Sequence, residues 1–92
     1  MYNQPAIQNL TLILGSTEYP ITLPADTRKL QISARNGAGI LQLAFNSGES
    51  GTKYISIPAG ATFWVDEMYL ENQTIYVQSP TAGVVVEVLT FA

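Results

Sequence analysis

Short segments of alternating apolar and polar residues recur about every 10–12 residues, and this recurrence constrains the fold more than any other feature. Successive side chains of a β-strand point to opposite faces, so such alternation predicts strands with one buried face. No segment sustains the period of a helix. The pattern therefore predicts an all-β protein.

The predicted strands, about eight in number, are bounded by turn residues. They cover residues 7–14, 19–23, 28–35, 40–45, 52–57, 61–70, 74–79 and 83–91. Strands at this spacing are typical of an antiparallel β-sandwich or a jelly roll, and we expect a jelly-roll-like sandwich. The expected core is Leu10, Leu12, Leu30, Ile32, Leu41, Leu43, Ile55, Ile57, Ile75, Val77, Val84, Val86 and Val88.

Turn residues predict how these strands are connected. Asn36-Gly37 is a strong signal for a two-residue hairpin turn, which would pair residues 28–35 with residues 40–45. Pro58 is expected at the second position of a type I turn that Gly60 closes in the left-handed conformation. We expect residues 52–79 to form a meander. Pro20 restricts its strand to a sheet edge or its own first positions.

The chain has 92 residues, which predicts one domain, with residues 1–6 as an N-terminal arm. The sequence contains neither cysteine nor histidine, so disulfides and a zinc site are not expected to stabilise the domain. Only 12% of the residues are charged, about half the usual share. Association with copies of itself or with a larger surface is the remaining common source of stability for a small domain.

Several function classes are disfavoured by the charge pattern. The basic residues are Arg28, Lys29, Arg35 and Lys53, and they form no long cluster. Binding to a nucleic-acid backbone requires clustered cations, so no nucleic-acid partner is expected. No apolar run reaches the length of a membrane span, and the first residues lack the pattern of a signal peptide.

Catalytic chemistry is also not expected. Without histidine and cysteine, the common nucleophile pairs and transition-metal ligand sets are missing. Asp66 and Glu67 are adjacent, so on a strand they point to opposite faces and cannot act as an acid–base pair. The loop at residues 46–51 carries glycines and serines, but it lacks the lysine and the helix of a phosphate-binding loop. We expect no enzyme, no cofactor and no metal.

The aromatic residues allow three interpretations. Tyr54, Trp64 and Tyr69 would suit a platform on which sugar rings stack, as in a carbohydrate-binding module for host-surface glycan. Alternatively, Phe63 and Trp64 fill the core, as aromatic residues of small β-domains often do. A third interpretation is a contact between subunits, where tyrosine and tryptophan are enriched.

The last predicted strand, GVVVEVLTF at residues 83–91, is apolar on both faces. An exposed edge with such a sequence would aggregate, and a closed oligomer would prevent this. We therefore expect self-association with Leu89 and Phe91 in or beside the interface and Tyr76 as a further candidate. The alternative is that the second sheet covers this face within one chain.

Residues 23–91 resemble the small β-sandwich virion proteins of tailed bacteriophages, which include head decoration (cement) proteins and neck or tail accessories. The resemblance is carried mainly by YISIPAG with an aromatic residue soon after it, and by TIYVQS. It extends over ARNG, LQLAFN and VVVEVLTF. It implies a non-enzymatic structural protein of the virion, assembled in the bacterial host cytoplasm. It further implies a homotrimer that binds the major capsid protein or another virion protein.

Overall fold

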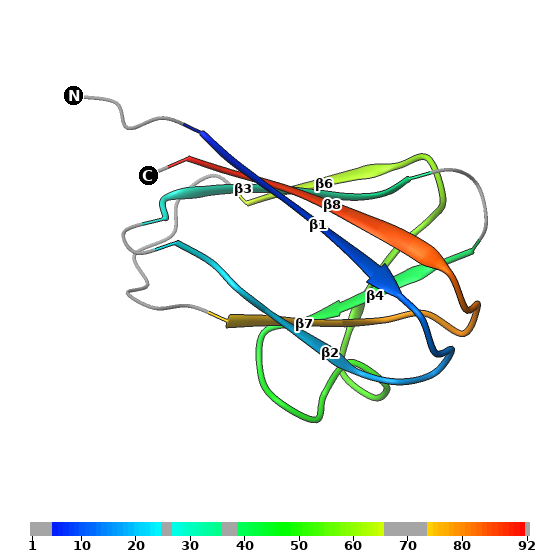
Figure 1. Cartoon of the computed structure of the whole chain (residues 1–92). Coiled ribbons are helices and arrows are strands. Elements are labelled where there is room, and N and C mark those ends of the chain that lie inside the picture. Colours follow the sequence, from blue (N-terminus) through cyan, green and yellow to red (C-terminus); the bar gives the residue numbers. More distant parts are fainter. Residues whose placement is uncertain (1–4, 25–26, 36–38, 66–73, 92) are drawn as a thin grey trace.

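The computed structural model describes residues 5–24, 27–35, 39–65 and 74–91, and its strands form the two layers of a sandwich (Figure 1). The eight strands are β1 (Ala6–Leu12), β2 (Tyr19–Thr22), β3 (Lys29–Arg35), β4 (Leu41–Ala44), β5 (Ile55–Ile57), β6 (Thr62–Val65), β7 (Thr74–Gln78) and β8 (Val84–Phe91). No helix occurs in these ranges, and hence none that is long and apolar enough to cross a membrane.

Each sheet contains four antiparallel strands. Sheet A has the order β1-β8-β3-β6, and sheet B has the order β2-β7-β4-β5. Apart from β4, which is followed by β5 of the same sheet, each of the strands β1 to β7 is followed along the chain by a strand of the opposite sheet. Two packed sheets connected in this way form a jelly roll, which confirms the predicted fold class.

Two predicted connections are wrong. β3 and β4 do not form a hairpin, because β3 pairs with β8 and β6 in sheet A while β4 pairs with β5 and β7 in sheet B. The Asn36-Gly37 turn itself lies outside the described residues. The stretch from β5 to β7 is not a meander either, since β6 lies in sheet A between two strands of sheet B. Turn residues mark where the chain reverses, but they do not determine which sheet the next strand joins.

The core lies between the sheets and follows the alternation of the strands. Its buried hydrophobic residues are Leu12, Ile21, Leu23, Leu30, Ile32, Ala34, Leu41, Leu43, Ala44, Ile57, Ile75, Val77, Val84, Val86 and Val88. Of the residues expected there, Leu10 is half-buried and packs against this core. Ile55 was expected in the core and is 41% exposed, because β5 is a short edge strand with a neighbour on one side only.

The turn between β5 and β6 begins one residue later than the expected type I turn. The N–H of Ala61 donates to the carbonyl of Pro58 over 3.0 Å, so Pro58 is the first residue of the turn. Gly60 has a φ of +83°, as expected for a left-handed residue. A positive φ at the third position is the signature of a type II turn.

The edges of the two sheets differ in how they are protected. β1 and β2 are edge strands on the same side of the sandwich, and Gln8 Nε2 donates to the carbonyl of Thr22 over 3.1 Å between them. β2 contains Pro20, in agreement with the edge position predicted for it. β1 begins at Ala6, inside the segment expected to be an arm, and residues 1–4 lie outside the described residues.

Candidate functional site

The outer face of sheet A carries a row of side chains that runs across all four strands. Leu89 of β8 lies opposite Ile7 of β1 on one side and Gln31 of β3 on the other, and Gln31 lies opposite Trp64 of β6. Ile7 is 72% exposed and Trp64 is 55% exposed. Large apolar side chains thus lie at both ends of a row that faces away from the core.

A second row, next to the first, is polar. It consists of Asn9, Glu87, Ser33 and Thr62, which lie opposite one another on β1, β8, β3 and β6. Glu87 Oε2 accepts a hydrogen bond from Nε of Arg35 over 2.8 Å, and both side chains remain more than two-fifths exposed. Such an exposed ion pair contributes little to stability. It supplies both signs of charge to this face.

Six residues of the two rows, all except Trp64 and Thr62, line a shallow depression of about 240 Å³ on the outer face of sheet A. Its lining includes the apolar Ile7 and Leu89, the amides of Asn9 and Gln31, and the Arg35–Glu87 pair. We call this surface, together with Trp64 at its end, the sheet A face. This surface offers both apolar side chains and hydrogen-bonding groups to another molecule.

The three residues expected at an oligomer interface are divided between the two faces of the sandwich. Leu89 and Phe91 are half-buried on the outer face of sheet A. Tyr76 belongs to β7 in sheet B, where it alternates with the buried Ile75 and Val77 and therefore points outward from that sheet. One flat contact cannot include all three side chains.

The two faces of β8 have different environments. Val84, Val86 and Val88 are buried against sheet B, whereas Val85 and Leu89 point away from it and are half-buried. The alternative in which the second sheet covers the face with Val85 and Leu89 within one chain is therefore wrong, because sheet B packs on the other face of β8. The half-burial of the outer side chains reflects the central position of β8 between β1 and β3.

The two described aromatic residues of the expected sugar platform lie on different sheets. Trp64 lies on sheet A, whereas Tyr54 precedes β5 of sheet B and is 40% exposed. Tyr69 lies outside the described residues. The interpretation that Phe63 and Trp64 both fill the core is correct for Phe63, which packs against it, and wrong for Trp64.

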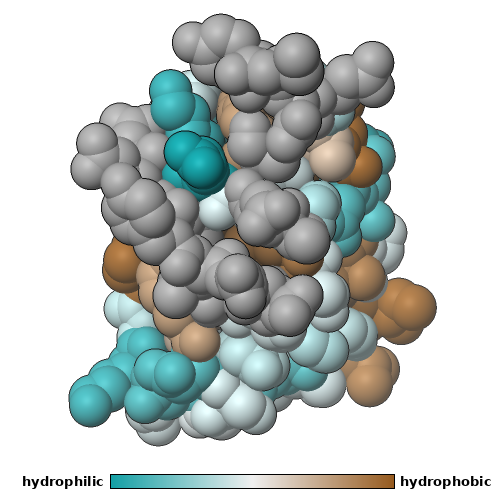
Figure 2. Space-filling model, turned by 90° about the vertical axis from the view of Figure 1, so that its left-hand side faces the viewer, coloured by the Kyte–Doolittle hydropathy of each residue, from teal (hydrophilic) through white to brown (hydrophobic). Residues whose placement is uncertain are grey.

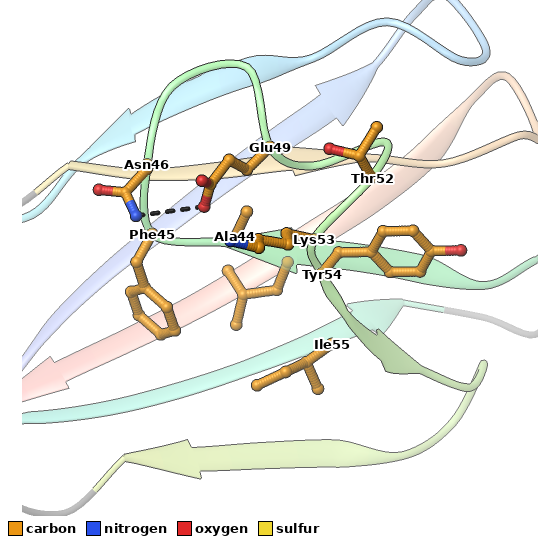
Figure 3. Close-up of a pocket in the computed structure, with 9 residues that line it drawn as sticks. Ala44, Phe45, Asn46, Glu49, Thr52, Lys53, Tyr54 and Ile55 are labelled. Atoms are coloured by element: carbon orange, nitrogen blue, oxygen red, sulfur yellow. Dashed lines mark hydrogen bonds between the residues drawn. The ribbon is translucent and has the colours of Figure 1, made fainter.

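Tyr54 lines a second depression, of about 410 Å³, between β4, β5 and the loop that joins them. Figure 3 shows the hydrogen-bonded side chains of Asn46 and Glu49 on one side of it and the ring of Tyr54 on the other. Phe45 supplies an apolar wall, and Lys53 supplies a positive charge. This depression lies on sheet B, away from the sheet A face.

The glycine- and serine-containing loop at residues 46–51 binds a carboxylate of the protein itself. Glu18 accepts hydrogen bonds from N–H of Gly48 over 2.8 Å and from N–H of Ser50 over 3.1 Å. The hydroxyl of Ser50 donates to the same carboxylate over 2.6 Å. The Ser50 hydroxyl, followed by the Gly48 N–H, lowers the pKa of Glu18 below its usual value, while burial opposes this. Donors that could face a phosphate are thus already engaged.

The described residues contain no group of three or more acidic, histidine or cysteine side chains arranged for a metal ion. Asp66 and Glu67, the adjacent carboxylates considered above, lie outside the described residues. The described surface offers exposed apolar side chains and hydrogen-bonding groups for contact with another molecule. Figure 2 shows the molecule from the side that lies at the left in Figure 1; hydrophobic residues reach the margins of the coloured surface, and more polar residues lie below them.

Comparison with known proteins supports the fold. No family model matches this sequence, and no curated protein matches it. A solved structure described as a de novo designed double-stranded β-helix, determined by NMR in solution, is similar, with a TM-score of 0.57 at 10% sequence identity. The match covers 98% of this chain and 100% of the designed one. At this identity the similarity concerns the architecture alone.

Proposed function

We propose that the protein is a non-enzymatic structural protein of a tailed-phage virion, most specifically a head decoration protein, that binds a larger protein surface through the sheet A face. The exposure of Ile7 and Trp64 at the two ends of one row across sheet A carries this proposal. The major capsid protein, or another virion protein, is the partner that the resemblance over residues 23–91 implies.

The composition of the sheet A face supports a protein partner. Tryptophan and arginine are enriched among the residues that contribute most to protein interfaces, and Trp64 and Arg35 both lie on this face. Burial of an exposed tryptophan or isoleucine contributes about 25 cal/mol per Å² of apolar surface removed from water. The polar row beside them supplies hydrogen bonds that fix the orientation of a partner.

Co-sedimentation of the purified protein with phage heads that lack it tests the proposal. Trp64→Ala should reduce the bound fraction strongly, because it removes an exposed aromatic side chain from the sheet A face. Tyr54→Ala is the matched control, since Tyr54 is an exposed aromatic residue on sheet B. Undiminished binding of Trp64→Ala, or a larger loss with Tyr54→Ala, would contradict the proposed face.

A second candidate function, glycan binding, is favoured by one specific observation. Trp64 lies directly opposite Gln31, and the hydroxyls of Ser33 and Thr62 lie in the next row. An exposed aromatic ring beside an amide and hydroxyl groups suits a sugar ring, which stacks on one face and hydrogen-bonds at its edges. A glycan array separates the candidates: binding that Trp64→Ala and Gln31→Ala both abolish would favour the glycan.

A further inference from the structure

Among the described sheet edges, β1 has the fewest features that protect an edge strand from pairing with another strand. An edge strand presents unpaired N–H and C=O groups, and proteins usually protect it with charges, proline or a short length. β1 has seven residues, AIQNLTL, which include neither a charge nor a proline. A long, uncharged edge of this kind is a template for pairing with another strand.

The other described edges are protected. β2 contains Pro20, which has no N–H to donate, and the carbonyl of Thr22 already accepts from Gln8. β5 has only three residues, and β6 has four. Of the described edges, β1 is therefore the one to which another strand could pair most readily.

We propose that β1 pairs antiparallel with β1 of a second copy of this chain, so that the two sheets A become one continuous sheet across a two-fold axis at Asn9. This contact uses the backbone edge of β1, whereas the sheet A face uses outward-pointing side chains, of which Ile7 and Asn9 belong to β1. Full overlap of two copies of β1 places Asn9 opposite its own copy, Ile7 opposite Thr11 and Gln8 opposite Leu10.

The sequence of β1 is complementary to itself in this register. No like charges face each other, because β1 has none. Continuing the register by one residue places Pro5 opposite Ile13, whose side chain is 71% exposed in the single chain. Leu10 is half-buried at the same edge, and pairing would complete its burial.

A second copy fits this edge better than an unrelated strand because a two-fold contact covers the β1 edges of both molecules at once. A two-fold contact uses the same edge of both copies and leaves no further β1 edge open. Pairing of β1 with β6 of another copy would instead leave an edge free at each end and would propagate into fibres. A two-fold dimer thus protects the edge and prevents growth.

Single cysteines test the register, since the chain has no cysteine of its own. Directly opposite residues of antiparallel strands have Cα atoms about 4.5–5.5 Å apart, which suits a disulfide. Asn9→Cys should therefore form an intermolecular disulfide under mild oxidation. Thr11→Cys is the control on the same face of the same strand, because two copies of it would lie about 13 Å apart in this register. Equal cross-linking of the two variants, or none with Asn9→Cys, would overturn the proposal.

The association itself is measured by light scattering and sedimentation equilibrium at micromolar concentration. The expected mass is twice that of the chain; a monomer overturns the proposal, and so does the trimer implied by the phage resemblance. Asn9→Lys and Asn9→Asp should each raise the dimer dissociation constant several-fold at low salt, because like charges would face each other. An equimolar mixture of the two variants should restore the dimer, and failure to do so would overturn the two-fold register.

The same substitutions at Thr62 control for effects of added charge. Thr62 is exposed on the outer face of β6, at the opposite edge of sheet A. Thr62→Lys and Thr62→Asp should leave the dissociation constant unchanged. Circular dichroism of each variant verifies that the strands remain folded, so that a loss of dimer is attributable to β1.

Discussion

Glu18 and Ser50 are 32 residues apart in the sequence, yet two hydrogen bonds join them. Both the hydroxyl and the backbone N–H of Ser50 donate to Oε1 of Glu18, over 2.6 Å and 3.1 Å. Glu18 directly precedes β2, and Ser50 lies in the loop between β4 and β5. The carboxylate therefore holds this loop against sheet B from outside the core.

This contact predicts a pH-dependent contribution to stability. Because the folded protein lowers the pKa of Glu18, the contribution is fully present above the pKa of the unfolded carboxyl group. It is lost as the pH falls through the lowered folded value. Glu18→Gln should lower the free energy of unfolding by about 1 kcal/mol at pH 7, since water screens this partly exposed group, and by less at pH 3. Urea unfolding at the two pH values measures the difference.

Glu49→Gln is the control for this prediction. Glu49 lies in the same loop, and its Oε1 accepts from Nδ2 of Asn46 over 3.1 Å. If Glu49→Gln changed the acid sensitivity of unfolding as much as Glu18→Gln, the effect would not arise from the contact with Ser50.

Leu43 and Ile55 lie opposite each other on β4 and β5, but they should differ in their contributions to stability. Leu43 is fully buried, whereas Ile55 is 41% exposed. Leu43→Ala should lower the free energy of unfolding by about 2–5 kcal/mol because it leaves a cavity in the core. Ile55→Ala should cost about 1 kcal/mol or less, in proportion to the smaller area buried. Comparable losses in chemical denaturation would contradict the edge position of Ile55.

Gly60 should tolerate asparagine better than valine. Its φ of +83° is strongly disfavoured for β-branched residues, while asparagine adopts positive φ more readily. No atom lies within 4 Å of a Cβ built at this position, so the backbone conformation alone determines the effect. Gly60→Val should destabilise the protein by at least about 1 kcal/mol more than Gly60→Asn. Thermal melting of the two variants tests this, and equal melting temperatures would argue against the left-handed turn.

Gly39 is restricted by a neighbour. A Cβ added there would lie 2.7 Å from Oγ1 and 2.9 Å from Cβ of Thr81, so a side chain would force the two loops apart. Gly39→Ala should therefore destabilise the protein by about 1–3 kcal/mol. Thr81→Gly in the same chain should recover part of that loss. A double-mutant cycle measures this coupling, and purely additive effects would show that the loss does not arise from contact with Thr81.

Local alternation was sufficient to predict which side of most strands faces the core. In β3 the buried Leu30, Ile32 and Ala34 alternate with more exposed polar residues, as the sequence indicated. Alternation does not reveal whether a strand is central or at an edge. The predicted core therefore includes Ile55, which is partly exposed at an edge, and lacks the buried Ile21 and Leu23, which lie in a short segment that contains a proline.

The sequence predicts the candidate site less completely than it predicts the inward-facing residues of the strands. Leu89 and Phe91 were identified from the apolar character of both faces of β8, but their neighbours come from β1 and β3, far away in the chain. The row that joins Ile7 to Trp64 depends on strand order and register, which short-range patterns do not specify. The Glu18 contact was missed for the same reason, since nothing near Glu18 in the sequence indicates Ser50.

The placement of β8 between β1 and β3 also determines how the chain can fold. Ala6 pairs with Thr90, and among the described strands only β4 and β5 are partners that follow each other directly in the chain. Sheet A therefore cannot be completed before β8 is available, although β3 and β6 can pair earlier. Closing such long loops before contacts form is entropically unfavourable, so we expect refolding on the millisecond-to-second timescale typical of non-local β-proteins.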